Sequence, residues 1–227
     1  MEFEGFERLD DLPIFPLATV LFPGAVLPLH IFEERYKKMI SFASENGGLF
    51  GLSFRTEAEV GVETFLEAGS VGCLAKISAS MPLEEGRMNL IAVGVVRYRI
   101  LEIRQLLPFL LARVEPFRDD EEQDARVEAL FTEIRELCVR FLVAADILDE
   151  SGDPLDKNLP DEAEAFSLLL SSFLPIDNGS KQALLEMTST WLRLTHLKGH
   201  VVTAIGDYDN HQMMKERAKG NGKGRLK

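Results

Sequence analysis

Residues 12–38 read LPIFPLATVLFPGAVLPLHIFEERYKK and decide the fold of the first half of the chain. Prolines at positions 13, 16, 23 and 28 interrupt apolar runs that are typical of strands. Because a proline cannot donate to a strand ladder, we expect these first strands at a sheet edge or beside a bulge, with Pro23 and Gly24 forming a turn. Apolar residues then recur at helical spacing over residues 32–44, and the NGG at residues 46–48 ends that predicted helix.

Short apolar runs bounded by glycine, proline or acidic residues continue to about residue 116. Three examples are LFGLSF at residues 49–54, SVGCLAKIS at residues 70–78 and MNLIAVGVV at residues 88–96. RYRILEI follows directly at residues 97–103 and partly alternates apolar and polar residues, as strands with one wet face do. Many short strands at such spacing predict a barrel or a strongly curved sheet. Residues 55–67 lack a clear period, and we interpret them as a loop.

The apolar period becomes helical after residue 117. It is sustained over residues 127–145, and this pattern is the clearest helix signal in the chain. Asp161 and Glu164 resemble a capping box for a second helix. Ser180 is expected to cap a third helix, and a fourth is predicted to begin near residue 189.

These patterns divide the chain into three expected parts. Residues 1–116 form a β-rich part that contains one helix, and residues 117–214 form a helical bundle. Residues 215–227 hold six basic residues and one acidic residue among glycines, which predicts a disordered basic tail.

Composition and charge favour a cytoplasmic globular protein. Hydrophobic residues make up 46% of the 227 residues and charged residues 27%, which is ordinary for a packed domain. We find no apolar run of the ~20 residues that a membrane helix needs. The first residues are acidic, whereas a secretory signal begins with basic residues followed by an apolar segment. The net charge of -12 opposes general binding to phosphate backbones, so nucleic acid is an unlikely partner class.

No residue pattern predicts catalysis, a cofactor or a metal site. Cys73 and Cys138 lie in apolar patterns and are expected to be buried free thiols. His196 and His200 have the spacing of a zinc-binding pair, but the metalloprotease glutamate is absent between them, and we interpret both as solvated or helix-capping residues. The sequence contains neither a phosphate-binding G-x-x-x-x-G-K-[ST] loop nor a G-x-S-x-G nucleophile elbow.

Arg97 and Arg99 alternate along a predicted strand and are therefore expected on one solvent-exposed face. There they could bind acidic groups of a partner or pair with carboxylates of the chain, and we favour the pairing. Gly69, Gly72 and Gly94 are expected to supply tight turns, bulges or close approaches of strands in a curved sheet.

The order of these motifs resembles the N-terminal substrate-binding domain of the Lon proteases. The helical segment FSLLLSSFLPIDNGSKQALLEM is also similar to that family, so the resemblance covers roughly residues 12–197. It implies a PUA-like β-barrel with a mixed, strongly curved sheet, followed by a C-terminal helical bundle, in the α+β class. The motif residues that carry it are Pro16, Phe22, Pro23, Gly24, Pro28, Gly69, Gly72, Gly94 and Arg97.

The resemblance also implies a function. In full-length Lon proteins the domain precedes an ATPase module and a protease module, and we expect this chain to stop before either begins. It is then expected to be a non-catalytic module, without cofactor, that binds unfolded polypeptide segments or a protein partner such as a protease component. Apolar groups that a small barrel does not bury are the candidate binding residues, namely Phe50, Phe54, Phe65, Met81 and Pro82. The alternative for each of them is that it closes an end of the barrel.

Two alternatives stay open on sequence grounds. PUA-like barrels also occur in RNA-binding proteins, a use that the acidic composition opposes and the basic tail favours only locally. An unrecognised hydrolase would need a convergent polar pocket, which the sequence does not reveal.

Overall fold

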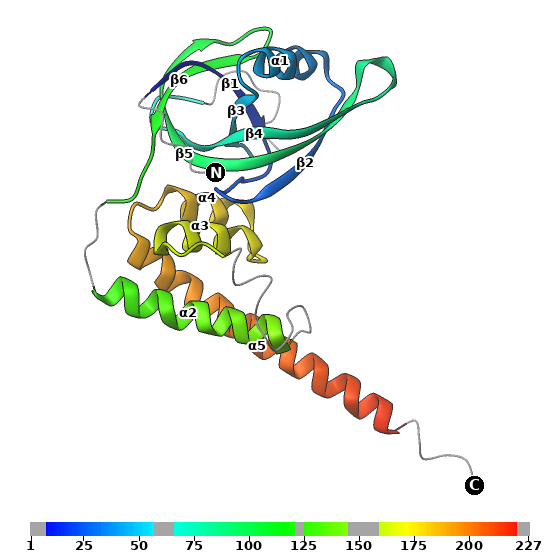
Figure 1. Cartoon of the computed structure of the whole chain (residues 1–227), viewed down its shortest axis with the longest axis vertical. Coiled ribbons are helices and arrows are strands. Elements are labelled where there is room, and N and C mark those ends of the chain that lie inside the picture. Colours follow the sequence, from blue (N-terminus) through cyan, green and yellow to red (C-terminus); the bar gives the residue numbers. More distant parts are fainter. Residues whose placement is uncertain (1–7, 57–65, 121–124, 145–158, 222–227) are drawn as a thin grey trace. The chain divides into compact units, whose positions relative to one another are not determined.

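The computed structural model describes residues 8–56, 66–120, 125–144 and 159–221 (Figure 1). The chain forms two compact units, and each is discontinuous in sequence. The first unit combines Met1–Asp120 with Glu164–Thr188, and the second combines Glu121–Ala163 with Ser189–Lys227. The strands that we predicted all fall in the first unit.

Six strands of the first unit form one mixed sheet, which is strongly curved (Figure 1). They follow the order β2-β5-β4-β3-β1-β6, and a further pairing of β5 with β6 closes the five strands other than β2 into a ring. β1 and β3 run parallel, while the other pairs are antiparallel. The predicted α+β class with a mixed, curved sheet is confirmed. The strands are β1 Leu9–Leu17, β2 Val26–Ile31, β3 Leu49–Phe54, β4 Val71–Pro82, β5 Met88–Gln105 and β6 Leu110–Pro116.

The prolines of the first segment lie at an edge or beside a strand irregularity, the two alternatives that we predicted. Pro28 lies in β2, which among the described strands pairs with β5 alone and is therefore an edge strand. β1 pairs on both sides and is not an edge strand, but its register against β6 shifts between Leu9 and Leu12, directly before Pro13. The predicted turn is confirmed, because the Ala25 amide donates to the Phe22 carbonyl (3.1 Å) and Gly24 has a φ of 79°.

β5 merges the two strands that we predicted at residues 88–96 and 97–103 into one strand of 18 residues. Its register against β4 shifts twice, and its register against β6 shifts twice more. Such irregularities bend a strand and increase its twist, which lets β5 pair with β2 and β4 near its start and with β4 and β6 farther along.

The helix α1 Glu34–Glu45 confirms the predicted helix of residues 32–44 and covers one end of the sheet (Figure 1). Its buried face packs into a core that includes Phe15 and Phe50. That face consists of Tyr36, Met39, Ile40 and Ala43, the positions expected from the helical period. A second core cluster contains Tyr98, whose buried hydroxyl lies 2.7 Å from the Ser53 hydroxyl.

Two more helices belong to the first unit, namely α3 Ala163–Phe173, apart from its first residue, and α4 Asn178–Glu186. The capping residue of α4 is Asp177 rather than Ser180, because the Asp177 carboxylate accepts bonds from the Ser180 amide (2.9 Å) and hydroxyl (2.6 Å). The carboxylate accepts a hydrogen bond from an unpaired backbone amide of the first helical turn. Ser180 lies three residues later, inside the helix, and so cannot take the capping position.

The second unit contains α2 Ala125–Ala144 and α5 Thr190–Asn221, which pack against each other. Lys198 of α5 pairs with Glu133 of α2 at 2.6 Å. α5 continues to Asn221 and so includes part of the segment that we expected to be a disordered tail. No helix in the described ranges is long and apolar enough to cross a membrane.

Candidate functional site

The outer surface of β2, β5 and β4 carries a mainly apolar patch that we call the outer face, made of Val26, Pro28, Ala79, Met81, Ile91 and Val93, with the exposed Lys76 in the row of Val26 and Val93. The registers set these side chains in rows across the sheet. Ile91 of β5 pairs with Pro28 of β2 on one side and Ala79 of β4 on the other. Directly paired residues point to the same face of an antiparallel sheet, so the three side chains form one row.

Strand alternation decides which residues reach the outer face. The intervening residues of β2 and β5, among them Ile31, Leu90 and Ala92, belong to the core beneath α1. The outward residues are exposed instead, with Val26 at 64%, Met81 at 55% and Ile91 at 44% of their surface. A contiguous apolar patch is typical of a surface that binds a partner, whereas scattered apolar residues are ordinary.

Polar and aromatic groups border the outer face. The Nδ1 atom of His30 lies 2.7 Å from the Oδ1 atom of Asn89, its direct partner across the strands. The His30 ring stacks on Phe32 with centroids 5.9 Å apart, and Phe32 is 58% exposed. A Phe–His stack beside aliphatic side chains extends the apolar surface and adds hydrogen-bonding groups at its border.

The turn that joins β4 to β5 is fixed to α1. It contains the short helix η1 Glu84–Gly86, and Glu85 has a φ of 59°. The Lys37 ammonium donates to the Glu85 carbonyl and to the Glu34 carboxylate, each at 2.8 Å. The hairpin that presents Met81 and Ile91 is thereby held at its turn by a helix, which orders the outer face before any partner arrives.

The candidate binding residues do not form one site. Met81 and Pro82 are exposed on β4, and Met81 belongs to the outer face. The prediction for Phe50 is wrong, because its side chain is fully buried against Phe15 and α1. Phe54 lines a separate pocket, and Phe65 lies outside the described residues.

Sequence reasoning missed Val26, Ile91 and Phe32 as surface residues. The only signal was the alternation in VLPLHI at residues 26–31, which requires one set of apolar residues to face away from the core. Pro28 was identified as a family motif residue, and it occupies the centre of the edge strand of the outer face.

The motif glycines give close approaches and turns, as expected. A Cβ atom on Gly94 would lie 2.1 Å from the Phe22 carbonyl oxygen. One on Gly72 would lie 2.5 Å from the Tyr98 hydroxyl, so both positions require glycine for space. Gly69 has a φ of +97°, a conformation that favours glycine.

Arg97 is buried, so its predicted position on a wet face is wrong, although its predicted pairing with carboxylates is present. It donates to Asp119 (2.5 Å), to Glu164 (2.9 Å) and to the carbonyls of Leu185 (2.9 Å) and Met187 (2.7 Å). The carboxylates arrive from segments distant in sequence and compensate the buried charge. Arg99 is exposed and pairs with Glu115.

The remaining candidate chemistry stays dispersed. Burial raises the pKa of the Cys73 thiol to about 12 and that of the Cys138 thiol to about 11, which leaves little reactive thiolate at neutral pH. His196 and His200 are exposed on α5. In the part of the chain that the structure describes, we find no group of three or more His, Cys, Asp or Glu residues arranged to hold a metal ion.

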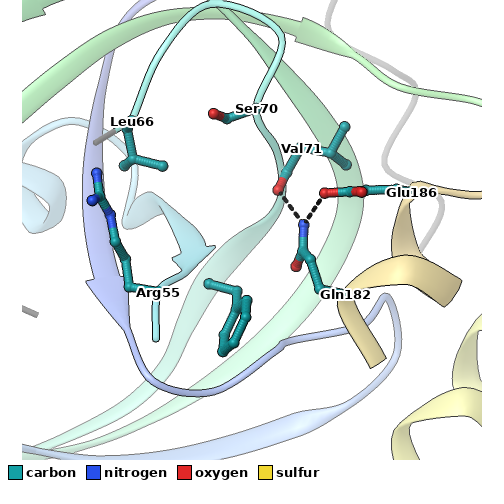
Figure 2. Close-up of a pocket in the computed structure, with 7 residues that line it drawn as sticks. Arg55, Leu66, Ser70, Val71, Gln182 and Glu186 are labelled. Carbon is teal, nitrogen blue, oxygen red and sulfur yellow. Dashed lines mark hydrogen bonds between the residues drawn. The ribbon is translucent and has the colours of Figure 1, made fainter. Parts of the chain in front are cut away.

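A pocket of about 140 Å³, drawn in Figure 2, is lined by none of the outer-face residues. Its lining comes from the end of β3, the turn before β4 and the helix α4. The residues are Phe54, Arg55, Leu66, Ser70, Val71, Gln182 and Glu186.

Comparison with known proteins points to one family. The family model described as ATP-dependent protease La (LON) substrate-binding domain matches residues 11–202. Lon protease 2 of Myxococcus xanthus is 27% identical over 186 residues, which cover 81% of this chain and 22% of that protein. Lon protease 2 of Syntrophobacter fumaroxidans is 25% identical over 224 residues, and here the shares are 96% and 28%. The chain thus spans about a quarter of the length of these relatives.

Two solved structures share the fold. The N-terminal domain of Lon protease from the Mycobacterium avium complex superimposes with a TM-score of 0.64 at 21% identity, covering 85% of this chain and 98% of that one. A Lon N-terminal domain protein from Xanthomonas campestris gives a TM-score of 0.58 at 26% identity, covering 84% and 98%.

Proposed function

Because the chain belongs to the ATP-dependent protease La (LON) substrate-binding domain family, we propose that it binds apolar segments of unfolded polypeptides through its outer face. The observation that carries this proposal is the exposure of Val26, Met81 and Ile91 on one surface of paired strands. Binding would remove these side chains from water, a gain of about 25 cal/mol per Å² of apolar area, without requiring a defined client sequence.

The edge strand beside the outer face favours side-chain contacts over added strand pairing. Among the described strands β2 pairs only with β5, but Pro28 at its centre has no amide hydrogen to offer a further strand. A client segment would therefore lie across the outer face rather than extend the sheet. Met81 suits such contacts, since its flexible thioether side chain adapts to differently shaped partners.

In this proposal the chain recognises clients for proteolysis and performs no bond cleavage itself. Its site would be a non-catalytic surface that needs no cofactor and that associates with a protease component. The cytoplasm is the proposed location, a compartment in which free thiols such as Cys73 and Cys138 persist. The net charge of -12 favours this proposal over RNA binding.

The test is binding of a fluorescently labelled, carboxymethylated and permanently unfolded protein, followed by anisotropy. The double variant Met81→Ser/Ile91→Ser removes two exposed apolar groups and should raise Kd at least tenfold, since burial of one such side chain contributes roughly 1.5–3 kcal/mol. Leu107→Ser is the matched control, because Leu107 is 64% exposed but lies outside the outer face. An unchanged Kd in the double variant, or an equal loss in the control, would contradict the proposal.

A further inference from the structure

The pocket of Figure 2 holds a buried acceptor whose orientation is fixed by its neighbours. The Nε2 atom of Gln182 donates to the Val71 carbonyl at 3.0 Å and to the Glu186 carboxylate at 2.7 Å. Both partners only accept, so the nitrogen and oxygen of the Gln182 carboxamide cannot be exchanged. The Oε1 atom of Gln182 is buried and has no hydrogen-bond donor among the described residues. A buried carbonyl oxygen without a donor is costly, so a ligand that supplies a donor at this position would be stabilised.

The other polar groups of the pocket indicate the chemical class of the ligand that would carry this donor. The Glu186 carboxylate is a second acceptor close to Gln182, since the two side chains are hydrogen bonded. Ser70 already accepts from the Glu67 amide at 3.3 Å, so its hydroxyl hydrogen is directed elsewhere as a donor. The backbone of Ser70 is held in place because its carbonyl accepts from the Ile100 amide at 2.9 Å. Figure 2 shows Ser70, Gln182 and Glu186 around the same opening.

The donors and acceptors of the pocket favour a neutral ligand group that has both. A carboxylate has no hydrogen to give to Gln182 or to Glu186. An ammonium group could donate to both acceptors but has no acceptor for the Ser70 hydroxyl. A primary carboxamide carries two N–H donors for the two adjacent acceptors and a carbonyl that accepts from Ser70.

The size of the pocket agrees with an organic group rather than a single water molecule. A volume of about 140 Å³ exceeds the ~30 Å³ share of one water molecule several times. The exposed lining is mainly polar, and Phe54, Leu66 and Val71 add apolar atoms that methylene groups can contact. A side chain with methylene groups below a terminal amide satisfies the walls and the polar groups together.

We propose that this pocket binds the side-chain carboxamide of a glutamine or asparagine residue presented by a peptide. The carboxamide would donate to Gln182 and Glu186 and accept from Ser70. The site is separate from the outer face and goes beyond the function proposed above, so it stands or falls independently of client capture there.

Titration of the ¹⁵N-labelled full chain with N-acetylglutamine methylamide tests the proposal, read at the backbone amides of Ser70 and Val71. We expect saturable shifts, with at least fivefold weaker binding of the N-acetylmethionine and N-acetylglutamate methylamides. The methionine derivative tests apolar and backbone recognition, and the glutamate derivative tests recognition of an acid. Equal affinities for the three compounds would overturn the proposal.

Variants of the pocket complete the test. Gln182→Leu should raise Kd for the glutamine derivative at least tenfold. Gln105→Leu is the matched control, because the Gln105 amide also donates to a backbone carbonyl, that of Phe109 (3.0 Å), yet does not line this pocket. If circular dichroism shows that Gln182→Leu is unfolded, Glu186→Ala replaces it, since Glu186 is exposed; it should weaken binding at least threefold. Unchanged affinity in the folded pocket variant would overturn the proposal.

Discussion

The guanidinium of Arg97 lies 2.5 Å from the carboxylate of Asp119, and both side chains are buried, with exposures of 1% and 4%. The same guanidinium binds Glu164 and two carbonyls near the end of α4. One side chain of β5 therefore connects the strands to three segments that lie far apart in sequence. Its loss would remove one donor from each of these carboxylate and carbonyl groups.

Arg97→Met should lower the free energy of unfolding by about 3 kcal/mol, because it removes a buried positive charge that lies against the buried carboxylate of Asp119. Arg99→Met is the matched control on the same strand. Arg99 and Glu115 are 47% and 32% exposed, and such a pair contributes less than about 1 kcal/mol. Urea denaturation followed by circular dichroism measures both values. Equal costs for the two variants would show that burial of Arg97 is not decisive.

Gly94→Ala should destabilise the chain by about 3 kcal/mol, the upper part of the range for forced overpacking, since its Cβ atom would overlap the Phe22 carbonyl. Gly199→Ala should instead stabilise it by about 0.5–1 kcal/mol, because position 199 lies inside α5 with no atom within 4 Å of the new Cβ. Thermal denaturation should show a lower melting temperature for Gly94→Ala and a higher one for Gly199→Ala. A neutral Gly94→Ala would mean that β5 tolerates displacement from the turn at Phe22.

The helix cap Asp177 should make the stability of the chain depend on pH, and its replacement by asparagine should remove this contribution. Hydrogen bonds from the Ser180 hydroxyl and amide lower the pKa of the Asp177 carboxyl below its ordinary 3.8. The ionised cap therefore contributes stability above about pH 4, and this contribution is lost as the pH falls through the lowered pKa. Asp177→Asn keeps a capping oxygen but does not titrate. The gap between the melting temperatures of the two chains should narrow from pH 7 to pH 2, and a constant gap would contradict the assignment.

Cys73 should resist alkylation in the folded chain. Burial raises its pKa to about 12 from an ordinary 9, which lowers the thiolate fraction at pH 8 by roughly a thousandfold, and the side chain has no exposed surface. Cys138 is only partly buried and should react first. Peptide mapping by mass spectrometry after a timed iodoacetamide pulse separates the two thiols. Faster modification of Cys73 at an intact circular dichroism spectrum would refute this expectation.

The local sequence pattern was sufficient to predict most helices and strands, but it did not predict which of their faces are buried. The helical period placed α1, and Pro23-Gly24 placed the turn before β2, because both depend on neighbours in sequence. The continuity of β5 depends on pairing with β2, β4 and β6, which no local period records. Alternation also places Arg97 on a strand correctly, yet Asp119 and Glu164 determine that its face is buried.

Because local pattern does not show which residues are buried, it predicted only part of the candidate site. Met81 was recognisable because it precedes a turn rich in acidic residues. Phe50 and Ile91 are both apolar strand residues, and only the position of α1 decides that the first is buried and the second exposed. The carboxamide of Gln182 contacts Val71, more than a hundred residues earlier, so no spacing could have indicated that pocket.

Asp119, Glu164 and Met187 mark the places where the chain leaves and re-enters the first unit, and all three are bonded to Arg97. Asp120 and Thr188 are bonded to each other beside them, with the Asp120 amide 2.8 Å from the Thr188 carbonyl. The residues that flank positions 121–163 are thus bonded to one another. When the ends of a flexible loop are held together, each doubling of the loop length costs only about 0.6 kcal/mol. We therefore expect that a foreign sequence can be inserted between these ends while the strands keep their pairing.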